Sequence, residues 1–290
     1  MRIAAYIKNQ QRHVGVVSED GSTIQALKIE PALAEQGLLG LIDTYGDVSR
    51  LAELDRAAAE PLGSVQLLAP IPRPRRNIFC VGRNYHAHAQ ELSGSVFKDN
   101  SKNVAAWPIV FTKVPETVIA HGEEVLLPAD ITEQVDYEAE LAIVIGKRGK
   151  NIGKAEAMSH VWGYTIVNDV TARDVQMRHQ QWDLGKSFDT FCPMGPWLVT
   201  ADTFNGADTR VRCWVNDELR QEGQTQNLIF DLPTLIETCS RGITLYPGDI
   251  IATGTPAGVG MGLNPPRYLK PGDRVRIEID GIGTLENTFR

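Results

Sequence analysis

The chain has 290 residues and a formal net charge of −7 at pH 7. This length is ample for a large buried core, and the acidic balance argues against a nucleic-acid surface or a basic membrane patch, so a small-molecule partner is favoured. No apolar run approaches the ~18 residues of a membrane span and the N-terminus lacks the apolar region of a signal peptide, so we expect a cytoplasmic protein.

Residues 1–70 predict a small N-terminal domain of strands and helices. The runs RIAAYI and HVGVVSEDGSTIQAL alternate like strands, and Asp20-Gly21 is a typical hairpin turn. After Pro31 the pattern turns helical, and it does so again over 51–60. The Pro-rich segment 69–76 (APIPRPRR) predicts an extended linker with a boundary near residue 72, so that residues 71–290 form a second, larger domain.

A histidine and a glutamate follow the first strand beyond the linker. NIFCVG leads into RNYHAHAQEL, where His88 and Glu91 are neighbours on one face of a helical turn. Such a pair can activate water as a general base, because the carboxylate orients the imidazole and raises its basicity. The local sequence by itself favours a surface helix with an incidental ion pair. A metal pair of His86 with His88 is a weaker alternative.

The next segment, Ser93–Trp107, is polar and has weak periodicity. Its length and its place after His88 predict a lid over the site, and a loop without a role is the alternative. Two strands follow, and Lys113 ends the first of them at a position where a lysine is usually solvated.

Two apolar strands carry three acidic side chains. In DYEAELAIVIG the strand period puts Glu138 and Glu140 on one face, and VWGYTIVNDVTARD ends at Asp169, just before a helix that we expect to begin at Thr171. Partly dehydrated carboxylates repel one another unless a cation lies between them. Because the ligands are all oxygens, we expect Mg²⁺, with Mn²⁺ or Ca²⁺ as alternatives. The other interpretation is the solvent face of an edge strand.

Lys186 lies between a glycine and a serine in an otherwise apolar and aromatic loop. A lysine in such a setting needs an anionic partner, which the three acids provide, and a solvated surface lysine is the alternative. Near the C-terminus a Gly-rich loop matches neither a Walker A nor a dinucleotide-binding pattern. With Thr253 and Thr255, this loop lets backbone amides approach a carboxylate ligand closely.

The four cysteines are far apart and form no CxxC pair, which predicts reduced and mostly buried thiols. Zinc-ribbon and redox functions are therefore excluded. The residues are Cys80, Cys192, Cys213 and Cys239.

Seven motifs occur in one order: CVGRNYHAHAQE, FTK, DYEAELAIVIGK, NDVTARDVQ, LGKSFDTFCPMGP, VNDELRQEG and GDIIATGTPAGVG. Together they resemble the fumarylacetoacetate hydrolase family, and in particular its bacterial members of the acylpyruvate hydrolase and 2-hydroxyhepta-2,4-diene-1,7-dioate isomerase type. The resemblance implies a mainly β fold with helices (α+β), a mixed β-sandwich roll behind a small N-terminal α+β domain. It also implies a homodimer that binds a divalent metal.

The resemblance implies roles for the residues singled out above. Glu138, Glu140 and Asp169 become the metal ligands, and His88 with Glu91 becomes the dyad that activates water. The resemblance therefore favours a general-base role for His88. It gives no support to a metal pair of His86 with His88.

Lys186 becomes the cation that faces the substrate oxygens and a developing enolate. The residues implied to contact the metal-bound keto acid or its waters are Arg83, Tyr85, Lys113, Arg173, Gln176 and Thr255.

The activity implied is metal-assisted hydrolysis of a carbon-carbon bond in a β-diketo acid, either an acylpyruvate such as fumarylpyruvate or a fumarylacetoacetate-like acid, in aromatic-compound catabolism. The alternative is isomerisation or decarboxylation of 2-hydroxyhepta-2,4-diene-1,7-dioate-type or oxaloacetate-type acids, because all these reactions share an enolate. A dicarboxylate-binding protein without catalysis is a further hypothesis, and nothing in the sequence favours it. The insertion 94–106 leaves the length of the substrate open.

Overall fold

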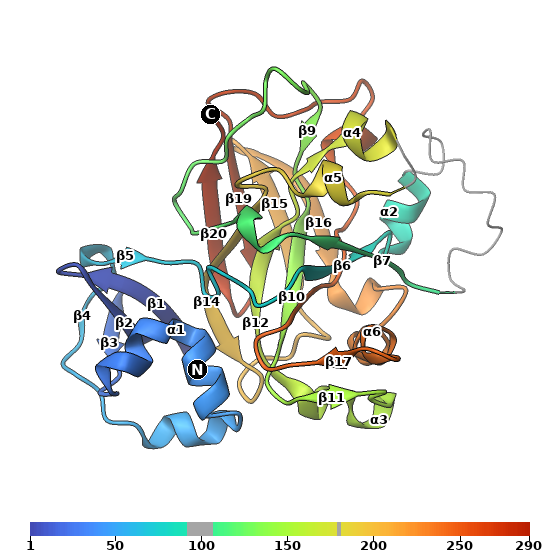
Figure 1. Ribbon diagram of the computed structural model, residues 1–290. Helices are drawn as coiled ribbons and strands as arrows, with labels where there is room; N and C mark the ends of the chain where they lie inside the picture. Colours follow the sequence, from blue (N-terminus) through green and yellow to red (C-terminus); the bar gives the residue numbers. More distant parts are fainter. Residues whose placement is uncertain (92–106, 179–180) are drawn as a thin grey trace.

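A twelve-stranded mixed sheet organises the structure (Figure 1). The computed structural model describes residues 1–91, 107–178 and 181–290. The strand order is β4-β3-β2-β1-β14-β12-β10-β18-β6-β7, with β5 beside β1 and β8 beside β14. The strands are β1 (Arg2–Lys8), β2 (Gln11–Val17), β3 (Thr23–Ala26), β4 (Glu60–Pro61), β5 (Gln66–Leu67), β6 (Ile78–Gly82), β7 (Ile109–Lys113), β8 (Val118–Ile119), β10 (Ala139–Ile145), β12 (Val161–Asn168), β14 (Cys192–Thr200) and β18 (Ile250–Ala252).

A four-stranded sheet with the order β16-β15-β19-β20 packs against one face of the large sheet. Its hairpins turn at Asn216-Asp217 and at Asp280-Gly281. The mainly β architecture with added helices confirms the predicted fold class. The remaining strands are β15 (Arg210–Val215), β16 (Glu218–Gln224), β19 (Arg274–Ile279), β20 (Gly283–Thr288), and the short pairs β9 (Val135–Asp136) with β13 (Thr171–Ala172) and β11 (Gly149–Lys150) with β17 (Thr244–Leu245).

Strand β10 lies in the middle of the large sheet, between β12 and β18. Its residues alternate between two cores: Leu141 and Ile143 face the four-stranded sheet, whereas Ala142 and Val144 face the opposite side. Every residue of β10 is buried. The interpretation of an edge strand with a solvent face is therefore wrong.

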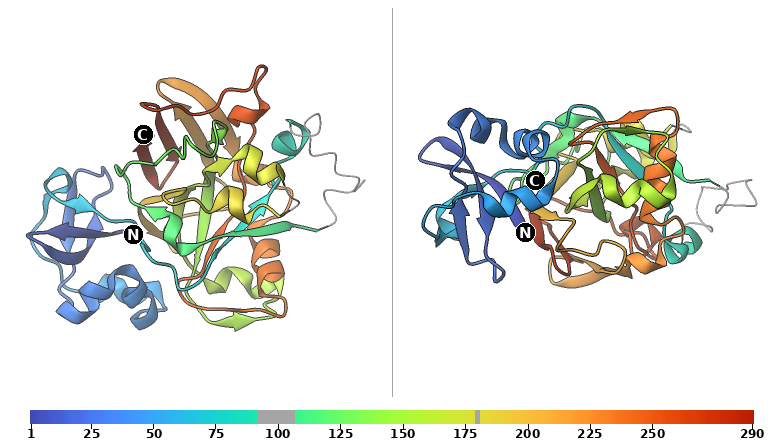
Figure 2. Two further views of the ribbon diagram at one scale, coloured as in Figure 1. Left: turned by 45° about the horizontal axis from the view of Figure 1, so that its top comes forward. Right: turned by 90° about the horizontal axis from the view of Figure 1, so that it is seen from below.

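Helices cover the outside of the sheets (Figures 1 and 2). Pro31 begins α1, where its missing N–H costs no hydrogen bond, and the Asp231 side chain caps α6 by accepting from Thr234 N. The helices are α1 (Pro31–Thr44), α2 (His86–Glu91), α3 (Lys154–Ala157), α4 (Arg173–Arg178), α5 (Asp183–Lys186) and α6 (Leu232–Ser240), with the 3-10 helices η1 (Val48–Glu53), η2 (Leu62–Ser64), η4 (Pro115–Thr117), η5 (Met158–His160), η6 (Thr225–Asn227) and η7 (Gly260–Gly262).

The elements before residue 70 lie to one side of the larger body, coloured blue in Figures 1 and 2. Strand β1 nevertheless pairs with β14, in the register Arg2↔Val199 and Ile3↔Leu198, so the large sheet is continuous across both parts. Residues 69–76 contain no helix or strand. The division of the chain at residues 70 and 71 stays a prediction.

Two local elements differ from those predicted. Segment 51–60 is not a helix: only η1 forms, and the following residues are extended, with a bridge between Leu27 and Arg56. Helix α4 begins two residues after Thr171, because β13 first pairs with β9. The predicted lid, Ser93–Trp107, lies outside the described residues except for its last residue.

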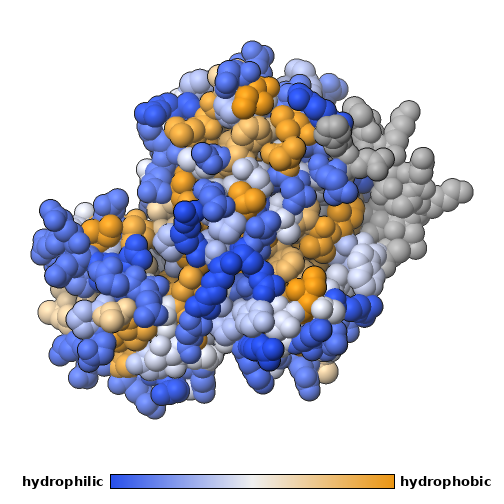
Figure 3. All heavy atoms as spheres, viewed as in Figure 1, coloured by the Kyte–Doolittle hydropathy of each residue, from blue (hydrophilic) through white to orange (hydrophobic). Residues whose placement is uncertain are grey.

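The four cysteines are free and buried, as predicted. On the face shown in Figure 3, hydrophilic and hydrophobic side chains are interspersed. Among the described residues, no helix has both the length and the apolarity needed to cross a bilayer.

Candidate metal centre and active site

The structure brings the three predicted metal ligands together. One oxygen from each of Glu138, Glu140 and Asp169 lies within 4.8 Å of the others. The pairing of β10 with β12 causes this, because Ala139 is opposite Asn168 and the Asp169 N–H donates to the Glu138 carbonyl at 2.9 Å. All three residues are buried, and none is more than 6% exposed.

Three buried cations surround the acids. Lys186 Nζ donates to Glu138 Oε2 at 2.8 Å and to Asp169 Oδ2 at 2.7 Å. Lys113 Nζ lies 2.8 Å from Asp169 Oδ1 at ion-pair distance, while its aligned hydrogen bonds go to the carbonyls of Val170 and Lys186. Arg173 Nη1 lies 2.7 Å from Glu138 Oε1. The expectation of a solvated Lys113 is therefore wrong.

The pKa values show how unequal the acids are. Burial, then the charges of Asp169 and Glu138, raise the pKa of Glu140 well above its usual range. Burial also acts to raise the pKa of Glu138, but Lys186 and Arg173 outweigh it and lower that pKa. Burial acts to lower the pKa of Lys186, and the charges of Asp169 and Glu138 reverse this, so its ammonium group stays protonated.

These residues fit a divalent cation. Glu140 Oε2 accepts from Gly254 N at 2.8 Å, yet no cationic side chain of the described residues pairs with this carboxylate. A buried carboxylate without a cation is costly, and the cluster supplies only oxygen donors, the set that hard divalent ions prefer. Glu138, Glu140 and Asp169 would hold the ion.

Gly254 shows why the Gly-rich loop is needed here. Its φ of 104° favours glycine, and a Cβ at this position would lie 2.7 Å from Asn84 Cβ. The glycine thus lets its N–H reach Glu140. Thr255 Oγ1 follows, donating to the Ala139 carbonyl at 3.0 Å and accepting from Gln221 Nε2 at 2.8 Å.

The predicted dyad also forms. His88 Nδ1 and Glu91 Oε2 are 3.1 Å apart on α2, and Glu91 Oε1 accepts from Gly258 N at 3.0 Å. His88 is 3% exposed, so the pair is not an incidental one on a solvated surface, whereas His86 is exposed. The catalytic role of the dyad stays a prediction.

A cavity of about 20 Å³ lies between the dyad and the acids, enough for one ion or one water molecule. Tyr85 and Lys113, although predicted to contact the substrate, do not line it; Tyr85 is buried and its hydroxyl has no partner among the described residues. The lining residues are Val81, Gly82, Arg83, His88, Phe111, Glu138, Glu140, Arg173, Gln176, Trp182, Lys186 and Thr255.

Three residues near this cavity were not identified from the sequence. Phe111 lies under Lys186, with Nζ 4.9 Å from the ring centroid, and Trp182 packs on Phe111 at 5.3 Å between centroids. Asp136 accepts from Arg173 Nε at 2.8 Å. The available signals were Phe111 at the start of the FTK motif, Trp182 just before the LGKSF motif, and the acid two positions before Glu138. None of these patterns indicates what the side chain contacts.

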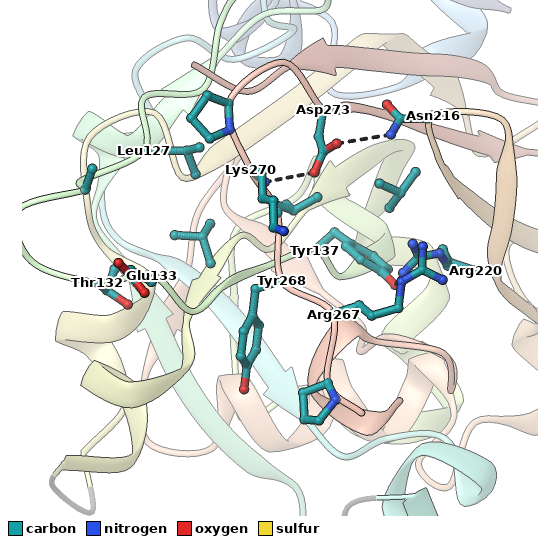
Figure 4. Close-up of a pocket in the computed structure, with 16 residues that line it drawn as sticks. Leu127, Thr132, Glu133, Tyr137, Asn216, Arg220, Arg267, Tyr268, Lys270 and Asp273 are labelled. Carbon is teal, nitrogen blue, oxygen red and sulfur yellow. Dashed lines mark hydrogen bonds between the residues drawn. The ribbon is translucent and has the colours of Figure 1, made fainter. Parts of the chain in front are cut away.

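A larger cavity of about 680 Å³ lies apart from the acid cluster (Figure 4). Tyr137, Arg220, Arg267, Tyr268 and Lys270 are among its lining residues. The two sites adjoin along the chain, since Tyr137 directly precedes Glu138. None of the predicted site residues lines this cavity.

Comparison with known proteins finds relatives with more than one named activity. The chain is 45% identical to oxaloacetate tautomerase YisK of Bacillus subtilis, over 94% of this chain and 95% of YisK. A structure of a fumarylacetoacetate hydrolase from Exiguobacterium antarcticum has 40% identity and a TM-score of 0.84, covering 100% of this chain and 99% of the other. A maleylpyruvate hydrolase from Sphingobium sp. SYK-6, in complex with manganese(II) and pyruvate, has 32% identity and a TM-score of 0.77, covering 100% and 98%.

The predicted main activity is wrong in the light of these relatives. Several curated relatives at 41–45% identity are oxaloacetate tautomerases, which are isomerases and not hydrolases of carbon-carbon bonds. The findings favour the stated alternative, isomerisation of oxaloacetate-type acids. The error has a chemical reason: a base beside a metal and a lysine serves proton transfer at an enol as well as activation of water. The link to aromatic-compound catabolism rested on hydrolysis and falls with it.

The resemblance read from the seven motifs is confirmed independently. The family described as fumarylacetoacetate (FAA) hydrolase C-terminal matches residues 77–290, which include every residue of the acid cluster, the dyad and the surrounding cations. On this match, and on the likeness over nearly the whole length to the proteins above, the chain belongs to the fumarylacetoacetate hydrolase family.

Proposed function

We propose that this protein is a divalent-metal-dependent tautomerase that interconverts the enol and keto forms of oxaloacetate. The observation that carries the proposal is that His88 lines the same small cavity as Glu138, Glu140 and Lys186, so a base faces the point where an enolate oxygen would lie. The 45% identity to a protein named oxaloacetate tautomerase supports this substrate. The arginine and lysine side chains that line this cavity also have the charge that attracts a keto acid with two carboxylates.

Substrate binding is assigned to the cationic side of the cavity. Arg173 Nη2 is buried and has no hydrogen-bond partner among the described residues, while Nη1 serves Glu138 and Gln176. A substrate carboxylate would satisfy this donor, and an unpaired buried donor is otherwise costly. Arg83, Gln176 and the Thr255 hydroxyl line the same cavity and would complete the binding of the acid.

Proton transfer is assigned to the dyad. With Glu91 holding Nδ1, the other ring nitrogen of His88, Nε2, takes a proton from C3 of the keto form, and the electron pair of that C–H bond moves into a C2–C3 double bond. The resulting negative charge on the C2 oxygen lies beside the Lys186 ammonium group. The proton on Nε2 then passes to this oxygen, giving the enol, and the reverse sequence gives the keto form.

When bound by Glu138, Glu140 and Asp169, the divalent ion supplies the positive charge that favours the enolate over the ketone. We infer Mg²⁺, with Mn²⁺ as the nearest alternative and Ca²⁺ as a further one. The all-oxygen ligand set supports this choice.

We infer a homodimer as well. Three large hydrophobic residues, Leu126, Ile131 and Leu219, are 42%, 50% and 47% exposed. Each directly adjoins in sequence a residue that lines the larger cavity of Figure 4. Large apolar side chains left exposed next to the lining of a cavity are a feature of surfaces that are covered in an assembly. Sedimentation velocity at micromolar concentration should give the mass of two chains, and the mass of one chain would contradict the inference.

The deciding experiment uses freshly dissolved enol oxaloacetate, which loses its ultraviolet absorbance as it converts to the keto form. The protein with Mg²⁺ should accelerate this loss, and EDTA should abolish the acceleration. Release of CO₂ should stay at the rate measured with Mg²⁺ in the absence of the protein. No acceleration, or CO₂ release that matches the loss of enol, would rule out a tautomerase.

A further inference from the structure

Asp136 is a buried carboxylate that accepts four hydrogen bonds. Oδ2 accepts from Arg173 Nε at 2.8 Å and from Met261 N at 2.9 Å. Oδ1 accepts from Gly260 N at 2.7 Å and from Tyr137 N at 2.9 Å. An ionised carboxylate offers about four acceptor positions, so this side chain is fully satisfied without touching the cavity.

One of these bonds leads to the acid cluster. Arg173 Nε donates a hydrogen bond to Asp136, and Arg173 Nη1 lies 2.7 Å from Glu138 Oε1. Arg173 is 1% exposed, so it has no solvent to replace a lost partner. Asp136 therefore fixes the orientation of the arginine that in turn holds a metal-ligand carboxylate.

Two other bonds lead to the dyad. Gly260 and Met261 lie in η7, and the N–H of Gly258 just before it donates to Glu91 Oε1 at 3.0 Å. Gly258 has a φ of 105°, and a Cβ there would lie 1.8 Å from the Arg220 carbonyl oxygen, so the loop has little freedom to rearrange. Asp136 thus anchors the loop that holds the carboxylate of the dyad.

The dyad depends on such anchoring because α2 has only six residues. Helices shorter than about 12 residues are not stable by themselves in water, so tertiary contacts decide where α2 lies. One of these contacts is the hydrogen bond from Gly258 to Glu91. It fixes the carboxylate of Glu91, which in turn holds His88.

We propose that Asp136 is a positioning residue that couples the two halves of the active site. Through Arg173 it sets the place of Glu138, and through the loop 258–261 it sets the place of Glu91. The expected effect on turnover rests on the proposed tautomerase function, whereas the effects on metal binding and on local mobility do not.

The test replaces Asp136 by asparagine, which keeps the shape but turns one acceptor into a donor. In metal-free protein, hydrogen exchange should become faster in peptides that cover α2 and 258–262, with the rest of the chain unchanged. The dissociation constant for Mn²⁺ should rise about 10–100-fold, the usual effect of losing a partner behind a metal ligand, and kcat should fall by a similar factor.

The matched control is Asp174→Asn. Asp174 lies close in the chain to Arg173, but its side chain accepts from Thr132 Oγ1 and Val175 N and reaches neither half of the site. The hydrogen-exchange rates, Mn²⁺ affinity and kcat of Asp174→Asn should equal those of the wild type. Equal changes in both variants would overturn a specific role for Asp136.

A second variant separates the link through the loop 258–261 from the link through Arg173. It also remains informative if Asp136→Asn does not fold. Met261→Pro deletes one N–H that Asp136 accepts, and Met261 lies in the first turn of a 3-10 helix, where a proline breaks no intrahelical hydrogen bond. Exchange in α2 should rise and kcat should fall about tenfold, while Mn²⁺ affinity should stay within about twofold, because Arg173 keeps its partner.

Unchanged exchange in α2 in these variants, or exchange raised evenly over the whole chain, would overturn the proposal. A wild-type protein that does not act on oxaloacetate would overturn the proposed function alone, since exchange and Mn²⁺ binding would still decide the role of Asp136.

Discussion

Glu140 differs from the other two acids of the cluster in its partners. Glu138 and Asp169 each contact two cationic side chains, whereas Glu140 accepts from the backbone N–H of Gly254. The desolvation penalty of its charge is therefore poorly compensated by the protein itself, which raises its pKa. At the residue scale, this carboxyl group is the one most dependent on a bound cation.

This imbalance predicts a pH dependence for the metal-free protein. The pKa of Glu140 is higher in the folded than in the unfolded chain, where it is near 4.5, so the folded state binds more protons above that pH. The stability that the protonated group contributes is complete below pH 4.5 and is lost as the pH rises through the folded pKa. In EDTA, the melting temperature of Glu140→Gln relative to wild type should therefore increase between pH 5 and pH 8.

The exposed Glu133→Gln serves as its control, and its melting temperature relative to wild type should not change over the same range. A constant difference between Glu140→Gln and wild type would show that Glu140 ionises normally. With excess Mg²⁺ the trend should disappear, because the ion replaces the proton.

The dyad gives a second prediction at the residue scale. His88→Ala should lower the tautomerisation rate by about 10²–10⁴-fold, the usual contribution of a general base. Mn²⁺ affinity should remain within about twofold, since His88 is not among the three clustered acids. His86→Ala, two residues away and exposed, should behave as wild type. Equal losses in both variants would remove His88 from the mechanism.

At the scale of elements, the site is built at the ends of β10, β12 and β18. Strand β10 contributes Glu140, β12 leads into Asp169, and β18 leads into the Gly-rich loop with Gly254. Because β10 pairs with both of the other strands, their ends meet at one place. The loop after β18 must approach closely, and only glycine fits there.

Gly254→Ala tests this approach. A Cβ adds left-handed backbone strain, about 1–2 kcal/mol, and a clash with Asn84. Gly242→Ala is the matched control, since Gly242 has a φ of 77° and no atom within 4 Å of an added Cβ. Chemical denaturation should show a larger loss of unfolding free energy for Gly254→Ala, and its Mn²⁺ affinity should also fall. Equal losses would mean that crowding at Gly254 is unimportant.

At the scale of the whole molecule, metal binding should stabilise the fold. Glu138 and Glu140 lie just before and within β10, and Asp169 follows β12, so the unfolded chain offers no comparable site. At a Mg²⁺ concentration of 100 times the dissociation constant, the gain is about 2.7 kcal/mol. Differential scanning fluorimetry should show a concentration-dependent rise of the melting temperature, absent in Asp169→Asn. A Mg²⁺ response retained in that variant would place the ion elsewhere.

The sequence determined the strand periods, the turns at Asp-Gly pairs and the order of motifs, because these depend on neighbours in the chain. The positions of Glu138 and Glu140 followed from the period of a single strand. The segment 51–60 was misread because its Ala-rich pattern favours a helix, whereas pairing with distant residues such as Leu27 decided its conformation.

Only the tertiary structure decided which charges meet. Lys113 looked like a solvated residue at a strand end, yet the fold buries it beside Asp169, and Asp136 carried no signal of its contacts with Arg173 and η7. The reaction type was also beyond the sequence pattern, since a base, a lysine and three acids serve hydrolysis and tautomerisation alike. Which charges meet depends on distances between residues far apart in the chain, which local patterns do not encode, whereas the reaction type is proposed from the named relatives.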